Sequence, residues 1–304
     1  MKSIPSINDI LAQVSTERLQ WYVKKIEGLR HGWENYAALE QKAAFIEDTF
    51  KSFHYSVENQ EFLYHERTYR NIVATLEGVH QEKERILLGA HYDAAWGSPG
   101  ADDNGSGVAI LLEVADILSN NKPQRTVQFA AFTLEEPQPQ TIHFLIGSET
   151  FARESKKSNI SYQAVIILES VGYTDDGVGS QIVPILVRIP VSKKGNFLGV
   201  IANSRSKSIM EAFHMLSQVH VPELITVPYK VPLSGRFSPE TRVSDHASFW
   251  DHGYPALMLT DTAMFRNPHY HTSHDRFETL DFHFMTNVTK AVLSFILKFA
   301  NDFE

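Results

Sequence analysis

The chain has 304 residues, of which 43% are hydrophobic and 21% charged, proportions that are ordinary for a folded protein with a large buried core. Its 36 acidic residues outnumber its 28 basic residues, and the formal net charge of −8 argues against a nucleic-acid partner or an anionic membrane surface. There is no cysteine, so disulfides, thiolate metal sites and cysteine nucleophiles are excluded, and a metal would have to bind His, Asp or Glu.

The amino-terminal segment lacks the pattern of a targeting signal. Residues 1–10 contain no continuous apolar run, so we expect no signal peptide. No apolar stretch approaches the length of a membrane span, so we expect a cytoplasmic protein without membrane contact. Nothing in the sequence indicates an oligomeric state.

Helical periodicity dominates residues 1–53, which we predict to form two helices. Apolar residues between 11 and 26 recur at mixed helical spacing. The second helix has a clearer apolar stripe, because residues three and four apart share one face of a helix. This stripe consists of Ala38, Leu39, Ala43, Ala44, Ile46 and Phe50.

After residue 53 the pattern changes to short apolar runs separated by helices. The predicted strands are 71–76, 85–90, 126–133, 163–168 and 256–260. Residues 108–118 have helical periodicity, and so does the last segment, where residues between 285 and 299 share one face. Strands that alternate with helices predict an α/β fold with a mixed, mostly parallel central sheet flanked by helices.

Residues 174–241 are less regular. They contain a predicted strand at 183–187 and a predicted helix at 204–219, and several prolines follow. Because the sequence on both sides belongs to the same predicted sheet, we interpret this segment as an insertion that lines the site. The whole chain, 1–304, is then a single domain.

Acidic and histidine side chains follow the predicted strands at the points where the strands end. In such sheets, ligands bind beyond the carboxyl ends of the strands. His91 and Asp93 follow the strand 85–90 and would share a face of the extended chain. Asp93 could accept a hydrogen bond from the imidazole nitrogen that does not bind metal. A buried histidine beside a surface acid is the alternative.

Two acidic pairs occupy similar positions. Asp102 and Asp103 lie among small residues, where one carboxylate could bridge two cations; capping of the next helix is the alternative. Glu135 and Glu136 follow the strand 126–133. One of them could bind metal while the other takes a proton from water, or both could be solvated loop charges.

Glu169 and a histidine tract complete the set. Glu169 directly follows the strand 163–168, as a ligand or a cap would. His269, His271 and His274 lie close together, which suits a metal site or a solvated loop. Oxygen and nitrogen donors without sulfur favour zinc, with manganese and cobalt as alternatives.

The ordered set of motifs resembles the M28 family of zinc peptidases. The resemblance covers about residues 91–281 and extends loosely to the amino-terminal helices. It implies a zinc exopeptidase-like fold and a metal-dependent hydrolase, an aminopeptidase that acts on a peptide or aminoacyl substrate. The matching motifs are His91-Tyr92-Asp93, Gly100-Ala101-Asp102-Asp103, Glu135-Glu136, Ser244-Asp245-His246-Ala247-Ser248 with Gly253-Tyr254-Pro255-Ala256, and Tyr270-His271-Thr272.

The resemblance also implies two zinc ions per chain and a ligand set for each. Asp103 would bridge the two ions. His91 and Glu169 would complete one site, and Glu136 and His271 would complete the other.

Three further residues would act in catalysis if the resemblance holds. Glu135 looks like the general base, and Asp93 is similar to the acid behind the first histidine. Tyr270 matches a tyrosine that helps to stabilise the oxyanion in some members. Ser244, Asp245 and His246 look either structural or like residues that support the ligands from behind, and we expect no metal ligand among them.

Two features depart from the family pattern. Glu169 stands where the family usually has Asp, and the longer side chain still reaches a metal but leaves the number of metals open. The loop 137–146 is longer than in the better-known aminopeptidases, and we expect it to reshape the substrate cleft beside the glutamate pair.

Two other functions fit the same scaffold. Glutaminyl cyclases resemble this fold, and an acyltransferase of that kind would use one zinc and cyclise an amino-terminal glutamine. Asp102 and Asp103 followed by Asn104 look more like the two-metal peptidases. A non-catalytic binding module would have lost ligands or the base, whereas all five ligand positions and Glu135 carry suitable donors.

Overall fold

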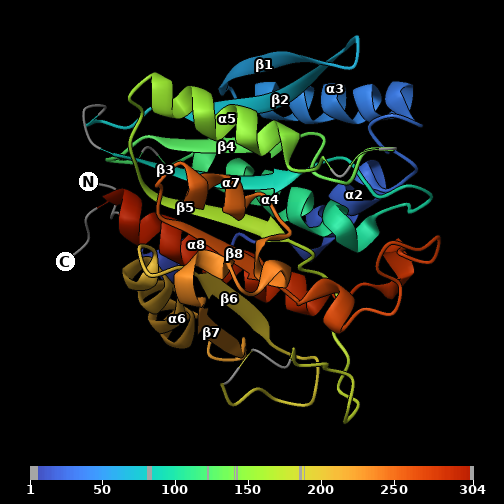
Figure 1. Ribbon diagram of the computed structural model, residues 1–304. Helices are drawn as coiled ribbons and strands as arrows, with labels where there is room; N and C mark the ends of the chain where they lie inside the picture. The colour runs from blue at the N-terminus through green and yellow to red at the C-terminus, as the bar shows by residue number, and fades with distance from the viewer. Residues whose placement is uncertain are drawn as a thin grey trace.

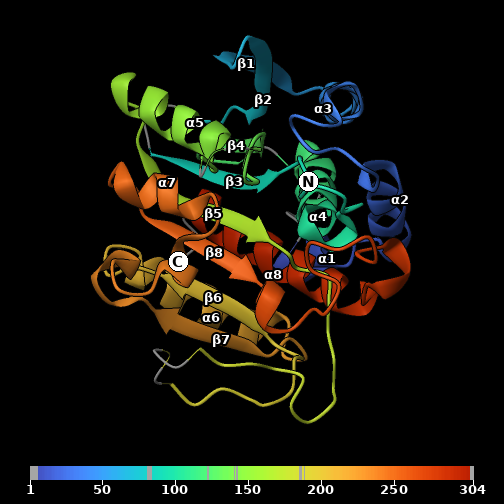
Figure 2. The same cartoon turned by 45° about the vertical axis from the view of Figure 1, so that its right-hand side comes forward.

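The computed structural model describes residues 6–80, 84–121, 123–139, 141, 143–184, 187 and 189–301, which form one sheet with helices on both faces (Figures 1 and 2). The strands are β1 (Ser56–Tyr64), β2 (Arg67–Leu76), β3 (Arg85–His91), β4 (Val127–Phe132), β5 (Tyr162–Glu169), β6 (Leu198–Ala202), β7 (Thr226–Lys230) and β8 (Ala256–Thr260). The helices are α1 (Ile7–Leu11), α2 (Thr16–Ile26), α3 (Tyr36–Ser52), α4 (Gly107–Ser119), α5 (Ile146–Lys157), α6 (Lys207–His220), α7 (His246–Asp251) and α8 (Phe282–Asn301).

The sheet has the strand order β1-β2-β4-β3-β5-β8-β6-β7. The central strands β4, β3, β5 and β8 are parallel, so their carboxyl ends lie at one edge of the sheet. Antiparallel pairs join β1 to β2, β2 to β4, and β6 to β8, while β6 and β7 are parallel. The predicted α/β class with a mixed, mostly parallel sheet is therefore confirmed.

β5 shows why the central strands are continuous apolar runs in the sequence. Val165 and Ile167 belong to the core on one face of the sheet, together with Phe151 of α5 and Phe249 of α7. Ile166 belongs to the larger core on the other face, which α4, α6 and α8 cover (Figure 2). A parallel strand that is buried on both faces carries apolar residues at successive positions rather than at every second one.

Most predicted elements are present at nearly their expected places. The predicted strands correspond to β2, β3, β4, β5 and β8, and the two predicted helices after residue 53 that flank them correspond to α4 and α8. Among the described residues, no helix is long and apolar enough to cross a membrane.

The first predicted helix is divided in two. Ser15 ends the connection between α1 and α2, and its side chain caps α2 by accepting a hydrogen bond from Arg18 N. The backbone N–H of Ser15 donates to Glu113 on α4 at 2.7 Å. This long-range contact holds the connection between α1 and α2 in place. The spacing of apolar residues did not indicate an interruption of the helix at this point. The second predicted helix is α3, whose stripe residues Leu39 and Phe50 are buried.

The prediction of a strand at 183–187 is wrong for the residues that can be described. Val183, Pro184 and Val187 form no strand, and Ile185 and Leu186 lie outside the described residues. Pro184 has no backbone N–H to donate to a neighbouring strand, and its carbonyl accepts a hydrogen bond from Val187 N at 2.9 Å. The predicted helix 204–219 is confirmed as α6, and β6 and β7 on either side of it add two strands to the sheet.

Substitution Glu113→Gln should lower the free energy of unfolding by about 1–3 kcal/mol. The Glu113 carboxylate is fully buried and accepts hydrogen bonds from Ser15 N and from two nitrogens of Arg18, so it ties α2 to α4. Urea denaturation measures the change. Glu211→Gln on α6, which removes an exposed acid, is the matched control. A Glu113→Gln protein as stable as this control would contradict the expected role.

Candidate metal centre

Three glutamates and one histidine of the centre lie at or just after the ends of three neighbouring parallel strands. His91 is the last residue of β3, and Glu169 is the last residue of β5 on one side of it. Glu135 and Glu136 follow β4 on the other side. The carboxyl ends of these strands coincide, so residues far apart in the sequence meet at one edge of the sheet, as expected for an α/β sheet.

His91 is fully buried and faces three carboxylates through one nitrogen. Its Nε2 lies 3.2 Å from Asp103 Oδ1 and 3.3 Å from Glu169 Oε2. Glu135 Oε2 is farther away, at 3.8 Å. Donor atoms of His91, Glu135 and Glu169 all lie within 4.8 Å of one another, which is a spacing that one metal ion can occupy.

His271 forms a second group with Asp103 and Glu136. Its Nε2 lies 3.1 Å from Asp103 Oδ2 and 3.2 Å from Glu136 Oε2. The two oxygens of Asp103 therefore face two different imidazoles, that of His91 and that of His271. The five residues expected to hold metal are thus brought together, with Asp103 between the two halves.

Asp275 holds the backbone that carries Asp103. Its carboxylate accepts hydrogen bonds from Asp102 N at 2.8 Å and from Asp103 N at 3.1 Å. The next residue, Asn104, donates from its side chain to Leu168 O at 2.7 Å, next to the end of β5. Asp103 is therefore fixed relative to both the carboxyl-terminal loops and the strand that carries Glu169.

Asp93 holds the glutamate pair in the same way. Its two carboxylate oxygens accept hydrogen bonds from Glu135 N and Glu136 N, each at 3.1 Å. Its Oδ1 also lies 3.5 Å from Nδ1 of His91, the nitrogen that faces away from Asp103. Asp93, the acid predicted behind His91, therefore lies beside the imidazole and holds the backbone of both glutamates.

Several buried polar atoms of the centre have no hydrogen-bond partner among the described residues. They include Nε2 of His91, Oδ1 of Asp103 and Oε1 of Glu136. Such atoms are rare in folded proteins, because a buried polar atom without a partner costs about 1–3 kcal/mol. Imidazole nitrogens and carboxylate oxygens that point into one small space are the donors that zinc takes. The residues present therefore fit divalent metal ions.

The mutual repulsion of the buried carboxylates also favours bound cations. Burial, followed by repulsion from Asp103, raises the pKa of Glu136 to about 7. Burial also raises the pKa of Glu135 well above its usual range, and Glu169 and Glu136 add to the effect. For Asp103, burial acts in the same direction but is outweighed by the attraction of the neighbouring His271 and His91 imidazoles, so its pKa lies below the usual range. Cations between these carboxylates would offset the repulsion.

Not every residue of the matching motifs enters the centre. Asp102 points away from the centre and accepts hydrogen bonds from Gly172 N at 2.8 Å and from Asn267 Nδ2 at 2.7 Å. It therefore belongs to neither group of candidate ligands, and its side chain does not cap α4. His269 and His274 belong to neither group of candidate ligands. In the motif 244–246, Ser244 Oγ donates to Glu169 Oε2 at 2.7 Å, so this residue contacts a candidate ligand without belonging to either donor group.

Tyr270 lies at the boundary between the centre and a cavity. Its ring stacks on His271, with the ring centroids 3.8 Å apart. Burial raises the pKa of the Tyr270 phenol, and the charges of Asp103 and Glu136 raise it further, so the hydroxyl keeps its proton. Tyr270 and Glu169 both line the cavity.

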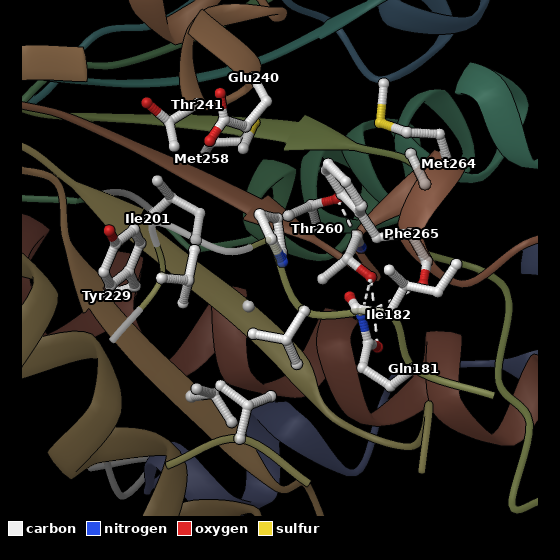
Figure 3. Close-up of a pocket in the computed structure, with 18 of the residues that line it drawn as sticks. Gln181, Ile182, Ile201, Tyr229, Glu240, Thr241, Met258, Thr260, Met264 and Phe265 are labelled. Carbon is white, nitrogen blue, oxygen red and sulfur yellow. Dashed lines mark hydrogen bonds between the residues drawn. The ribbon is translucent and has the colours of Figure 1, made fainter. Parts of the chain in front are cut away.

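This cavity encloses about 850 Å³, part of it open to solvent, and its walls are mainly apolar (Figure 3). Ile201 comes from β6, Met258 from β8, and Ile182 from the segment that precedes β6. Gln181 holds that segment in place, because its side chain donates to Thr262 Oγ1 at 2.9 Å. Among the described lining residues, the charged side chains are those of Glu169 and Glu240.

Comparison with known proteins gives a consistent result. The model for peptidase family M28 matches residues 71–296. An uncharacterized protein of Escherichia coli, YfbL, is 31% identical over 293 residues, which cover 93% of this chain and 88% of that protein. A probable zinc metalloprotease of Pyrenophora tritici-repentis is 24% identical over a region that covers 97% of this chain and 76% of that protein.

Solved structures share the fold at lower identity. The Legionella pneumophila LapA aminopeptidase superposes with a TM-score of 0.76 at 18% identity, covering 100% of this chain and 78% of that one. The glutaminyl cyclase of Porphyromonas gingivalis superposes with a TM-score of 0.69 at 21% identity, covering 93% of this chain and 98% of that one. At these identities the likeness shows the fold alone.

Substitution Asp103→Asn should remove more bound zinc than substitution of any other candidate ligand. It neutralises the carboxylate whose two oxygens face His91 and His271, so both groups lose a donor. Elemental analysis after dialysis measures the zinc content. Asp102→Asn is the matched control, because the neighbouring carboxylate points away from both groups. An Asp103→Asn protein with the zinc content of the unsubstituted protein would contradict the bridging position.

Proposed function

Because the chain belongs to peptidase family M28, we propose that it is a zinc-dependent aminopeptidase that removes the first residue from substrates with a free amino terminus. One observation carries the proposal. Asp103 lies between two complete groups of donors, with Oδ1 at 3.2 Å from His91 and Oδ2 at 3.1 Å from His271. A carboxylate in this position is what a centre of two metal ions requires.

The donor groups define where two zinc ions would be held. His91, Glu169 and Oδ1 of Asp103 would hold one ion. Glu136, His271 and Oδ2 of Asp103 would hold the other. When bound, zinc supplies Lewis-acid chemistry, which polarises a scissile carbonyl and makes water a better nucleophile at neutral pH. Glu169 can take the place of the aspartate that the family usually has, because its Oε2 reaches within 3.3 Å of His91 Nε2.

Glu135 is the proposed general base. It is buried at the end of β4, and its backbone N–H donates to Asp93, which fixes the start of its side chain. Glu135 Oε2 lies 3.8 Å from His91 Nε2, whereas Asp103 Oδ1 lies 3.2 Å from the same atom. We therefore assign the metal-bridging role to Asp103 and not to Glu135. Glu135 would take a proton from the attacking water and return it to the leaving amine.

Tyr270 is the proposed donor to the oxyanion. Its phenol keeps its proton, because burial and the neighbouring carboxylates raise its pKa. Its ring is fixed against His271, at the side of the centre where the cavity opens. A hydroxyl in this position can donate a hydrogen bond to the negative oxygen that forms when the carbonyl is attacked.

The cavity and the charge of the centre together suggest the substrate. The apolar walls formed by Ile182, Ile201 and Met258 suit an apolar side chain on the first residue of a peptide. A free amino terminus could bind a metal ion or one of the acids beside Asp103, whereas a blocked amino terminus could not. The proposed substrates are therefore peptides or aminoacyl amides with an apolar first residue.

A glutaminyl cyclase is the alternative that a specific observation supports. The fold of the Porphyromonas gingivalis enzyme covers 93% of this chain. That reaction would use a single zinc, whereas here the second donor group, with Glu136 and His271, is complete. Two zinc ions per chain and no release of pyroglutamyl product from glutaminyl substrates would exclude the alternative.

Substitution Glu135→Gln should lower kcat by about 10²- to 10⁴-fold, because an amide cannot accept the proton of the attacking water. Zinc content and thermal stability should stay close to those of the unsubstituted protein. Hydrolysis of an aminoacyl p-nitroanilide measures kcat. The control is Glu154→Gln, an exposed acid on α5. Undiminished turnover in a zinc-loaded Glu135→Gln protein would remove Glu135 from its role.

Aminoacyl amides of leucine, methionine and phenylalanine should be cleaved with a higher kcat/KM than the glycyl amide. Transfer of a leucine side chain from water to an apolar wall contributes about 1.5–3 kcal/mol, which corresponds to roughly 10- to 150-fold. A panel of such substrates with the zinc-loaded protein gives the ratios. N-acetylated versions test the need for a free amine. Preference for glycyl or glutamyl substrates would contradict the assignment of the cavity.

A further inference from the structure

A buried arginine contacts the loop that joins two candidate metal ligands. In the sequence it precedes the region that matches the family model. Arg30 belongs to the segment between α2 and α3, and the family match begins only at residue 71. The Arg30 side chain is fully buried, with 0% of its surface exposed. A guanidinium remains charged at any physiological pH, so burying it is expensive unless every donor is used and negative charge is near.

All described hydrogen bonds of the guanidinium go to backbone carbonyls. Nε donates to Tyr92 O at 2.8 Å, and Nη2 donates to Gly100 O at 2.8 Å. Nη1 donates to Pro99 O and, at 3.2 Å, to Gly28 O. One rigid planar group therefore binds both ends of the loop 92–100.

This loop connects two candidate metal ligands. Tyr92 directly follows His91, and Gly100 comes three residues before Asp103. Gly100 has a φ of +60°, and a Cβ there would collide with Asp103 O and lie only 2.9 Å from Nη1 of Arg30. Arg30, Gly100 and the backbone of Asp103 are therefore packed against one another, and the position of Asp103 relative to His91 depends on that contact.

The charge of Arg30 has its counterpart in the metal centre. The acids that stabilise it electrostatically are Asp275, Asp103 and Asp93. Asp275 holds the backbone of Asp103, and Asp93 holds the backbone of the glutamate pair. The buried cation therefore lies among the acids that position the ligands.

We propose that Arg30 is a positioning residue of the metal centre, which ties the loop 92–100 so that His91 and Asp103 are presented to the same cation. The inference rests on the proposed two-zinc function. A purely structural role would change the stability of the fold but leave the zinc affinity of the folded protein unchanged. The two roles therefore differ in a quantity that can be measured without any assay of activity.

The test compares zinc affinity in three variants of the full chain. Arg30→Met removes the charge and all the donors, and Arg30→Lys keeps the charge but cannot reach both ends of the loop. Arg70→Met is the matched control, because Arg70 is mostly buried and ties α3 to β2 through Glu40 and Glu47, away from the ligands. Zinc is titrated into each metal-free protein against a chromophoric chelator, and circular dichroism gives the folded fraction.

Arg30→Met should bind zinc about 10- to 100-fold more weakly, as is typical when a residue that supports a metal ligand is removed. Arg30→Lys should fall between Arg30→Met and the unsubstituted protein. Arg70→Met should keep the original affinity even if its melting temperature falls. If Arg30→Met does not fold, the comparison of Arg30→Lys with Arg70→Met decides the question.

Two outcomes would overturn the inference, and they can be told apart. Folded Arg30 variants with the zinc affinity of the unsubstituted protein would leave Arg30 with a structural role only. An unsubstituted protein that binds no zinc would contradict the proposed function itself, and the role of Arg30 with it.

Discussion

The architecture of the site depends on one buried carboxylate, that of Asp103, placed between two histidines that come from different parts of the chain. His91 ends a central strand, whereas His271 lies in a loop after the last strand. Each histidine faces a different oxygen of Asp103 at close to 3 Å. Buried acids gathered in this way repel one another and leave polar atoms without partners, and bound cations would offset both costs.

The surroundings of Asp103 are organised to hold this unfavourable cluster in place. Asp275 and Asp93 use both of their oxygens on backbone N–H groups of the ligand-bearing segments. Ser244 donates to Oε2 of Glu169, the oxygen that also faces His91. These hydrogen bonds hold the segments that carry Asp103 and the glutamates in position before any metal binds. The segment before β6 then closes an apolar cavity beside the centre.

The sequence predicted the parts of this account that depend on local patterns. The strands that carry His91 and Glu169 are buried on both faces, so they are visible as apolar runs, and the residues that follow them are fixed at the sheet edge by topology. The resemblance to the M28 peptidases is confirmed by the match over residues 71–296. β6 and β7 were not predicted, because they are short and lie near prolines in an irregular segment. A strand was predicted at 183–187 instead, where the described residues form none.

Long-range contacts explain the rest of what the sequence did not show. Asp275 acts on Asp103 across a separation of 172 residues, and nothing in its own neighbourhood marks it as a partner. Arg30 is a similar case, since its role depends on which carbonyl groups the fold brings to it. Asp102 shows the reverse, because its place in a motif suggested a ligand or a helix cap while its contacts are to Gly172 and Asn267.

The most direct test of the central claim is a crystal structure of the zinc-loaded protein with anomalous scattering measured on both sides of the zinc absorption edge. The account predicts two anomalous peaks about 3.5–4 Å apart, one on each side of the Asp103 carboxylate. A single peak, or peaks that Asp103 does not touch, would contradict it.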